Sequence, residues 1–367
     1  MSHSATLRSV LIFGGAGFIG SNWAHYLLRH TDAKVHVFDN LSRRGVTGNL
    51  EDLRKAADNS DRLKITIGDV RDRMLVNRVV ASASDIFNFA AQVAVTTSIN
   101  DPRQDFEVNL GGTFNILEAA RQSGNRPFLL FTSTNKVYGG MSSARLTSNR
   151  WRHQYPEESG TSESQPLDFH SPYGCSKGAA DQYVHDYARI YNLPTVVFRM
   201  SCIAGGRQFG SEDQGWVAHF LYSALQDIPL FIYGDGRQVR DVLCVDDLVR
   251  AFEAVRVNVK RTAGEIFNVG GGMENTVSLL ELMREIKKFT GHEVRHQFCP
   301  ARPGDQLVYV TDYSKLTRYT GWQPRVTVRG TLERIHEWWL NHQDLFVPQS
   351  SIETPAVAGL QEVREAA

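Results

Sequence analysis

The chain has 367 residues, of which 42% are hydrophobic and 22% charged, a composition typical of a soluble globular protein with about two domains. Lys and Arg together number 40, as do Asp and Glu, so the net charge is zero and does not favour nucleic acid or an anionic membrane surface as a partner. The four cysteines form no Cys-x-x-Cys pair, which argues against a metal site and favours free thiols in a reducing cytoplasm. The first apolar run, 10–13, is too short for a signal peptide, and no run reaches the roughly 18 residues of a membrane span.

The first half of the sequence alternates short apolar runs with amphipathic segments, as parallel strands joined by helices do. Strands are expected over residues 10–13, 34–38, 63–67, 85–89, 127–131 and 195–198. Helices are expected over 18–30, 104–122 and 172–191, the last after a Ser/Arg-rich connection, 140–166. This order predicts right-handed βαβ crossovers and an α/β, Rossmann-like doubly wound parallel sheet.

From residue 200 onward, Gly-rich and polar loops alternate with shorter elements, including helices expected over 279–289 and 331–341. The tandem Trp338 and Trp339 are expected to pack in a core. We expect a dinucleotide-binding domain over 1–200 and a smaller α/β substrate-binding domain mainly over 201–346. A mobile tail is expected over 347–367, with a possible short helix over 360–366.

A glycine-rich turn follows the first strand directly and opens the first helix. Gly14 allows the tight turn, Gly17 lets backbone N–H groups approach a pyrophosphate, and Gly20 allows close packing of helix on strand. Asp39 ends the second strand, where a carboxylate accepts hydrogen bonds from ribose hydroxyls and repels a 2′-phosphate, so NAD is favoured over NADP. Arg43 is expected to stack on the adenine or hold the pyrophosphate. The sequence therefore predicts an NAD site.

Tyr173 and Lys177 stand four residues apart and so share one face of the third helix. A nearby ammonium group stabilises a phenolate and lowers the pKa of a tyrosine toward neutrality, which makes it a usable general base for an alcohol. The fifth strand ends in a hydroxyl-rich run, 132–134, which can hydrogen-bond a reacting sugar oxygen and relay its proton. Asp69, after the third strand, is expected either to bind the adenine amino group or to cap the next helix.

These motifs, in this order, resemble the extended short-chain dehydrogenase/reductase superfamily of nucleotide-sugar epimerases and dehydratases over roughly residues 8–345. The resemblance implies that Thr134 is the catalytic hydroxyl residue, Tyr173 the general base and Lys177 the anchor of the ribose and the phenolate. It also implies bound NAD and a homodimer, or a tetramer, built through helices 104–122 and 172–191. The further cofactor-binding residues that it implies are Phe18, Ile19, Asn40, Ser42, Val70, Ala90, Ala91 and Gln92, together with Asp69, Tyr173 and Lys177.

Dehydratases of this superfamily carry an Asp-Glu pair directly after the catalytic Thr, because the elimination of water needs a proton donor and an acceptor. Here Asn135 and Lys136 occupy those positions and supply no carboxylate, which favours epimerisation through a transient keto sugar. The stretches 132–139, 165–181, 206–209, 213–217 and 238–243 are similar to the CDP-tyvelose (CDP-paratose) 2-epimerases. This similarity implies inversion of C2 in a CDP-linked deoxyhexose.

The nucleotide half of the substrate is marked by two arginines. Arg240 and Arg302 match positions that clamp a diphosphate in these enzymes, and Asp305 is expected at the nucleotide ribose. Phe231 and Tyr233 are expected either to bracket a pyrimidine or to pack as one face of a sheet in a core. The other substrate-binding residues are expected to be Asn135, Gln208, Gln214, Val217 and Gln238.

Two other functions stay open at this point. One is a 4-epimerase, or another enzyme of the superfamily that acts on UDP- or GDP-sugars. The other is a non-catalytic NAD-binding regulator, which the intact Thr134, Tyr173 and Lys177 disfavour. The connection 140–164 is expected to cover the substrate pocket.

Overall fold

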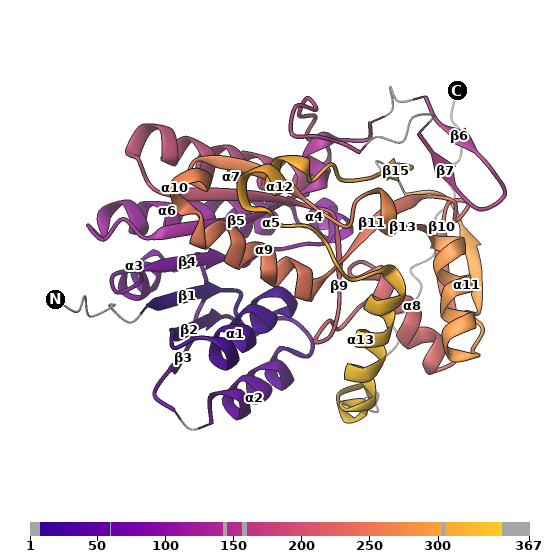
Figure 1. Ribbon diagram of the computed structural model, residues 1–367, viewed down its shortest axis with the longest axis horizontal. Helices are drawn as coiled ribbons and strands as arrows, with labels where there is room; N and C mark the ends of the chain where they lie inside the picture. Colours follow the sequence, from indigo (N-terminus) through magenta and orange to yellow (C-terminus); the bar gives the residue numbers. More distant parts are fainter. Residues whose placement is uncertain (1–7, 59, 142–144, 156–159, 303–304, 347–367) are drawn as a thin grey trace, which may run out of the picture.

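A computed structural model describes residues 8–58, 60–141, 145–155, 160–302 and 305–346 of the chain (Figure 1). Its centre is a seven-stranded sheet in the order β12-β8-β5-β4-β1-β2-β3, in which every neighbouring pair is parallel. The strands are β1 (Ser9–Phe13), β2 (Lys34–Asp39), β3 (Leu63–Ile67), β4 (Asp85–Asn88), β5 (Phe128–Thr134), β8 (Thr195–Met200) and β12 (Glu265–Val269). The predicted Rossmann-like sheet is confirmed, and the predicted tail lies outside the described residues.

Two features of the sheet differ from the sequence prediction. β5 continues past residue 131 to Thr134, because its last hydroxyl residues still pair with β8, where Ser133 lies beside Arg199. β12 was not predicted and comes from the second half of the chain, so residues beyond 200 return to the first sheet. The division of the chain near residue 200 stays a prediction.

Helices cover both faces of the sheet and bury its apolar side chains. One face is covered by α1 (Phe18–His30), α2 (Val46–Ala57), α9 (Val245–Val257) and α12 (Ser314–Thr320). The other is covered by α3 (Arg73–Val80), α6 (Gly112–Gln122) and α7 (Ser171–Tyr191). Shorter helices are α4 (Val95–Asn100), α5 (Pro102–Phe106) and α10 (Val259–Thr262). No helix in these described ranges is long and apolar enough to cross a bilayer.

The helix predicted over 104–122 is continuous but not α-helical throughout. A π-helical turn, Glu107–Gly111, separates α5 from α6. Asn109 lies in this turn and is fully buried, and its side chain exchanges two hydrogen bonds with the backbone of Gln92, at 2.9 and 3.0 Å. The π turn thereby fixes the segment after β4, in keeping with the frequent use of such turns at functional sites.

A second sheet is built around β11 (Val239–Cys244), which pairs with β9 (Cys202–Ala204), β13 (Thr276–Ser278) and β15 (Val308–Tyr309); this sheet and the elements packed with it are called the second domain below. A separate pair is formed by β10 (Leu230–Tyr233) and β14 (His296–Cys299), and the helices are α8 (Trp216–Leu225), α11 (Leu279–Thr290) and α13 (Val328–Leu340). Short 3₁₀ turns are η2 (Asn135–Tyr138), η3 (Met273–Asn275) and η4 (Gln343–Phe346). The structure confirms that Trp338 packs in a core, and Trp339 packs on it partly buried.

A hairpin formed by β6 (Thr147–Ser148) and β7 (His153–Gln154) occupies the connection between the two halves of the chain and lies against the second domain. Arg152 donates two hydrogen bonds to the carboxylate of Glu281, at 2.6 and 2.9 Å. Ser278 donates its hydroxyl to the carbonyl of Trp151 at 2.7 Å. The insertion is thus fastened to the start of α11, and its expected role as a cover over the substrate pocket stays a prediction.

A buried ion pair joins α7 to the sheet. The guanidinium of Arg199 donates two hydrogen bonds of 2.9 Å to Asp181, and the exposed fractions of the two side chains are 4% and 1%. Arg199 also donates to the hydroxyl of Tyr138 at 3.1 Å, which in turn donates to Asn268 at 2.7 Å. Four segments, the turn Asn135–Tyr138 after β5, β8, β12 and α7, therefore meet in one polar network.

We predict that Asp181→Asn lowers the free energy of unfolding by about 3–5 kcal/mol, because it leaves the Arg199 cation buried without its partner. The matched control on the same helix is Asp186→Asn, since Asp186 pairs with Arg189 in solvent, with exposed fractions of 44% and 62%. The control is expected to cost about 1 kcal/mol or less. Urea unfolding of both variants checks this, and equal losses would contradict it.

Candidate active site

A cavity of about 540 Å³ lies at the carboxyl ends of β1 to β4, where parallel sheets bind ligands. The sequence-predicted cofactor residues that line it are Gly14, Gly17, Phe18, Ile19, Gly20, Asp39, Asn40, Ser42, Arg43, Asp69, Val70, Ala90, Ala91 and Gln92. Residues that the sequence did not mark also line it, among them Arg71, Thr97, Gln104 and Val108. These come from helices and loops that reach the cavity only through the fold, so no local motif indicates them.

The glycine-rich turn leaves no room for side chains at two of its positions. Gly14 has φ +72°, and a Cβ atom there would lie 2.7 Å from the backbone nitrogen of Ala90. A Cβ atom on Gly20 would lie 2.2 Å from the carbonyl oxygen of Gly14. The turn therefore packs directly on the segment that follows β4 and on the start of α1. The free N–H groups at the start of α1 suit an anion.

Asp39 is held at the end of β2 by backbone N–H groups. Its two carboxylate oxygens accept hydrogen bonds from Ala16 at 3.0 Å and from Leu41 at 2.9 Å. Burial raises the pKa of this carboxyl above its ordinary value, and the backbone donors offset part of that rise. A carboxylate at this position, a glycine turn closed to side chains and a cavity of this size together fit a dinucleotide.

Asp69 does not cap the following helix, so that alternative is wrong. α3 begins at Arg73, and Asp72 caps it by accepting the N–H of Leu75 at 3.0 Å. Instead, the carboxylate of Asp69 accepts two hydrogen bonds from the guanidinium of Arg71, at 2.8 and 2.9 Å. These hydrogen bonds lower the pKa of the Asp69 carboxyl to about 2. Asp69 is thus a fixed anion on the wall of the cavity.

Thr134, Tyr173 and Lys177 come together at the end of β5. All three are buried, with exposed fractions of 8%, 9% and 3%. The hydroxyl of Thr134 lies near that of Tyr173 and acts on its pKa, and the ammonium of Lys177 donates to the carbonyl of Thr132 at 2.6 Å. The same ammonium lies 4.1 Å from the centre of the Phe131 ring. The structure therefore assembles a hydroxyl, a phenol and an amine at one point of the sheet edge.

The expected lowering of the Tyr173 pKa is not found in this structure. Burial raises the pKa of Tyr173 to about 12, against smaller opposite effects of Thr134 and Arg43. Burial likewise lowers the pKa of Lys177 to about 7, despite the nearby carboxylates of Asp181 and Asp105. Desolvation disfavours the charged form of both groups more than their neighbours favour it.

A buried polar network positions the helix that carries Tyr173. Asn109 donates to Asp105 at 3.0 Å and to the hydroxyl of Ser176 at 3.1 Å. Ser176 in turn donates to Asp105, and the N–H of Tyr173 donates to the hydroxyl of Ser98 at 3.2 Å. Because Asn109 also holds Gln92, the network ties the start of α7 to the wall of the cavity.

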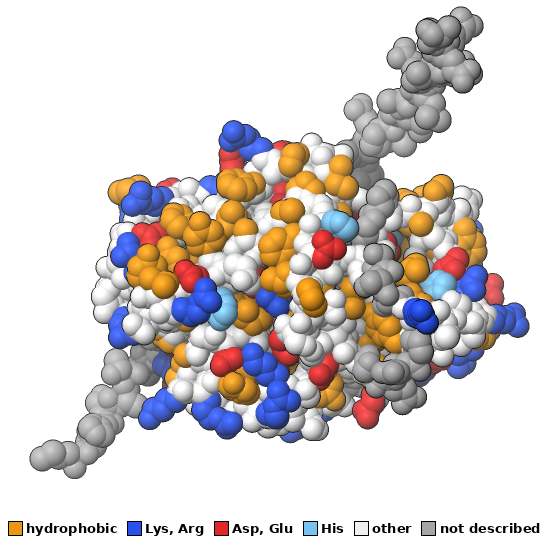
Figure 2. Space-filling view, turned by 90° about the horizontal axis from the view of Figure 1, so that it is seen from above, with side chains coloured by type: hydrophobic (Ala, Val, Ile, Leu, Met, Phe, Trp, Pro, Cys, Tyr) orange, Lys and Arg blue, Asp and Glu red, His pale blue; other side chains and the backbone are white. Residues whose placement is uncertain are grey.

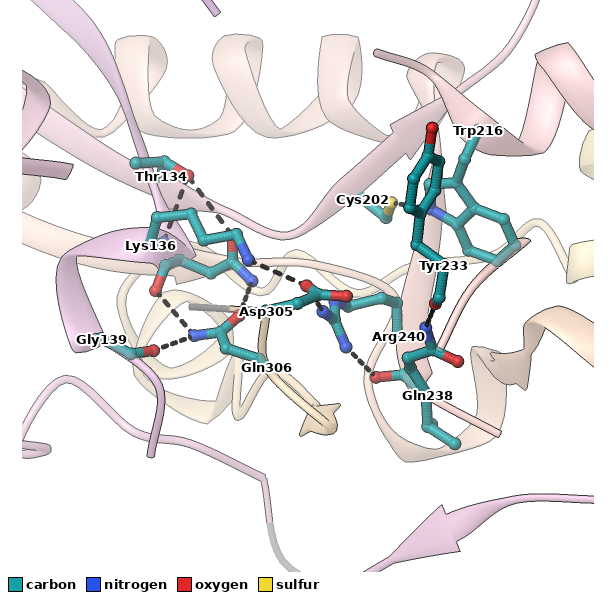
Figure 3. A network of polar contacts seen from close by, with 12 residues as sticks. Thr134, Lys136, Gly139, Cys202, Trp216, Tyr233, Gln238, Arg240, Asp305 and Gln306 are labelled. Atoms are coloured by element: carbon teal, nitrogen blue, oxygen red, sulfur yellow. Dashed lines mark hydrogen bonds and ion pairs between the residues drawn. The ribbon is translucent and has the colours of Figure 1, made fainter. Parts of the chain in front are cut away.

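A second group of polar side chains lies between Thr134 and the second domain (Figure 3). Asp305 accepts a hydrogen bond from Arg240 at 2.8 Å and one from Lys136 at 3.3 Å. Asn135, which was predicted to bind substrate, donates to Gln306 at 3.0 Å. Gln306 is fully buried and donates to the carbonyl of Gly139 at 2.6 Å. Sequence reasoning missed Gln306, although it directly follows the predicted Asp305.

Arg302 lies over one of the two aromatic residues of β10, Tyr233. The guanidinium carbon of Arg302 is 3.9 Å from the centre of the Tyr233 ring, and Arg302 pairs with Glu212 at 3.0 Å. Phe231 is 49% exposed, whereas Ile232 between them is buried. The exposure of Phe231 argues against the core-packing interpretation of this pair. Glu212 is a further residue that the sequence did not indicate.

The other predicted substrate residues lie at different depths. Gln214 lines the large cavity and accepts a hydrogen bond from Arg43 there, so the structure places it beside the predicted cofactor residues. Gln208 and Gln238 are almost fully buried and donate to backbone carbonyls. Their side-chain oxygens accept no hydrogen bond from the described residues. Val217 is 1% exposed and packs in the core of the second domain.

Comparisons with known proteins agree with this geometry. A family model described as GDP-mannose 4,6 dehydratase matches residues 11–335. A CDP-paratose 2-epimerase from Salmonella typhi is 42% identical over 337 residues, which cover 90% of this chain and 98% of the relative. A UDP-glucose 4-epimerase from Mycolicibacterium smegmatis is 33% identical, with 90% and 98% covered. The crystal structure of a UDP-glucuronic acid 4-epimerase from Bacillus cereus, in complex with UDP-glucuronic acid and NAD, has a TM-score of 0.78 at 25% identity and covers 91% of this chain and 99% of that chain.

We predict that Asp39→Asn weakens NAD binding by about 10-fold to 100-fold, the effect of one lost hydrogen bond to a charged group. NADP binding should weaken less, because the repulsion of its 2′-phosphate is removed. Asp72→Asn is the matched control, since Asp72 caps α3 outside the cavity and Asn is an equally good cap. Titration calorimetry on protein stripped of nucleotide measures both, and an unchanged NAD affinity in Asp39→Asn would refute the assignment.

Proposed function

The chain belongs to the GDP-mannose 4,6 dehydratase family within the extended short-chain dehydrogenase/reductases, and on that premise we propose that it is an NAD-dependent 2-epimerase of a CDP-linked deoxyhexose. It is an enzyme, because its relatives are epimerases and dehydratases, and NAD is the cofactor of the family. A CDP-paratose or CDP-tyvelose type of sugar is the proposed substrate. We also propose that it works in carbohydrate biosynthesis in the cytoplasm, in keeping with its four free cysteines.

The observation that carries the proposal is the absence of an acid/base pair after Thr134. Asn135 and Lys136 stand there, and the side chain of Asn135 is engaged by Gln306. The carboxylate that Lys136 contacts, Asp305, is held by two cations, Arg240 and Lys136, which outweigh the effect of burial and keep its pKa below the ordinary value. A carboxylate fixed as an anion in this way is a poor proton donor, so elimination of water is disfavoured and epimerisation is favoured.

The residues at the end of β5 suit proton transfer at a sugar hydroxyl. Tyr173 is proposed to take the proton of the alcohol, and the neighbouring Thr134 is proposed to orient the sugar oxygen and relay that proton. Lys177 is fixed by the carbonyl of Thr132 below them. Bound NAD supplies the group that accepts and returns hydrogen at the carbon, together with a positive nicotinamide ring. A positive charge near Tyr173 favours its phenolate, which burial alone disfavours.

The second domain supplies the groups for the nucleotide. Arg240 and Arg302 carry the fork-shaped donors that suit a diphosphate, and both lie beside acidic residues, Asp305 and Glu212, that hold them in place. The exposed ring of Phe231 and the ring of Tyr233 are proposed to bracket a pyrimidine. The alternative is a 4-epimerase, which the similarity to UDP-glucose 4-epimerase favours.

We predict that the protein epimerises a CDP-deoxyhexose and that Tyr173→Phe lowers turnover by roughly 10²–10⁴-fold, as expected for a lost general base. With substrate deuterated at C2, deuterium should return to C2 without exchange into solvent. Nuclear magnetic resonance of the product over time measures its stereochemistry, the rate of turnover and the deuterium that remains at C2. An isotope effect at C4 with none at C2 would favour the 4-epimerase, and solvent exchange at the inverted carbon would overturn the mechanism.

We also propose a homodimer formed through α6 and α7. Large apolar side chains on these helices and beside them are exposed, with fractions of 55% for Phe106, 42% for Phe114, 46% for Tyr183 and 63% for Ile190. The rings of Phe114 and Tyr183 meet edge to face at 5.8 Å, so α6 and α7 share this surface. Figure 2, seen from above the view of Figure 1, shows hydrophobic side chains gathered between charged ones. Such a surface is typical of an interface.

We predict that the protein is a dimer in light scattering at micromolar concentration and that Tyr183→Glu shifts it toward the monomer, because a carboxylate would be buried in the interface. Ile228→Glu is the control, since Ile228 is similarly exposed, at 48%, in the second domain. A monomeric wild-type protein, or equal effects of the two substitutions, would contradict this interface.

A further inference from the structure

Lys136 connects the two halves of the active site. Its backbone N–H donates to the hydroxyl of Thr134 at 3.2 Å, so its main chain lies beside the proposed catalytic hydroxyl. Its side chain then crosses to the second domain and reaches Asp305 at 3.3 Å. Figure 3 shows Lys136 and Arg240 approaching Asp305 from opposite sides. The ammonium group thus lies between the proposed catalytic hydroxyl and the proposed diphosphate clamp.

The charges of this group do not cancel. Two cations, Lys136 and Arg240, share one oxygen of a single carboxylate, Asp305, which leaves one positive charge in excess. The exposed fractions of the three side chains are 24%, 13% and 37%, so solvent screens this excess only in part. Burial and the neighbouring guanidinium both lower the pKa of Lys136. An anion delivered by a substrate would relieve this repulsion.

The other residues of the turn that carries Lys136 have side chains that are buried or hydrogen-bonded within the protein. Asn135 is bound by Gln306, and Tyr138 is buried and donates to Asn268. Val137 is buried and apolar. In the described structure, Lys136 is therefore the residue of η2 whose side chain can meet a substrate.

We propose that Lys136 binds the substrate where the sugar joins the diphosphate and retains the keto sugar while its ring turns over. This inference rests on the proposed epimerase function. Oxidation removes two electrons and a proton from the carbon, with the hydroxyl proton taken by Tyr173, and it leaves a ketone together with reduced cofactor. The ring must then release its contacts to present its other face, so the charged diphosphate is what holds the intermediate in the site. If the ketone leaves first, the cofactor stays reduced and that enzyme molecule stops.

Lys136→Met tests this role in the NAD-loaded enzyme with two measurements. Calorimetric titration with CDP should show about 10-fold weaker binding or more, and a smaller dependence of binding on salt, because one cation–phosphate contact is lost. The near-ultraviolet absorbance of reduced nicotinamide should build up with each turnover of the CDP-sugar, because more of the ketone escapes. Lys136→Arg should restore most of the CDP affinity. Lys288→Met, at an exposed lysine of α11, should change neither measurement.

The outcomes separate the inference from the function it rests on. If Lys136→Met binds CDP as the wild type does and accumulates no additional reduced cofactor, the inference is overturned while epimerisation stands. If the wild type neither epimerises nor reduces its cofactor, the proposed function fails, and the inference fails with it. Circular dichroism checks that Lys136→Met is folded, and Lys136→Gln, which keeps a polar side chain of similar length, replaces it if it is not. Normal CDP affinity in the folded variant would also overturn the proposal.

Discussion

The buried pair of Arg199 and Asp181 holds the helix of the active site against its strand. Removing both charges from water is costly, and the two parallel hydrogen bonds together with the hydroxyl of Tyr138 offset that cost. Asp181 lies on α7, one turn beyond Lys177, while Tyr138 lies in the turn that follows Thr134. The salt bridge therefore helps to set the distance between the amine and the hydroxyl of the site, together with the direct hydrogen bond from Lys177 to the carbonyl of Thr132.

A small number of close contacts also fixes the wall of the cofactor cavity. The glycine turn lies so close to the segment after β4 and to the first turn of α1 that side chains at Gly14 and Gly20 would overlap with backbone. Asn109, from a π turn in a distant helix, fixes the segment after β4 and also reaches Ser176 on α7. The wall of the cavity and the helix of Tyr173 are thus parts of one rigid unit, which suits a cofactor that must keep its position through two opposite reactions.

Local patterns of the sequence were enough to predict the strands around the cofactor cavity, its glycine turn and Asp39, because each lies in or directly after an apolar run. The resemblance to the superfamily supplied many of the other residues that line the cavity. Contacts between distant segments were not predictable in this way. β12 comes from the second half of the chain and pairs with β8 in the first sheet. Gln306 hydrogen-bonds Asn135, which lies 171 residues earlier in the sequence. The pKa of Tyr173 was also misjudged, because helical spacing shows that Lys177 is near but not how deeply both are buried.

Glu281 takes part in two structures at once. Its carboxylate and backbone form a reciprocal cap with Ser278 at the start of α11, and the same carboxylate receives Arg152 from the β6–β7 hairpin. The hairpin belongs to the first half of the chain by sequence, yet its anchor is the first turn of a helix in the second half. Shortening this insertion would consequently remove the hydrogen bonds of Arg152 from the first turn of α11. The length of the loop and the stability of that distant helix are therefore coupled.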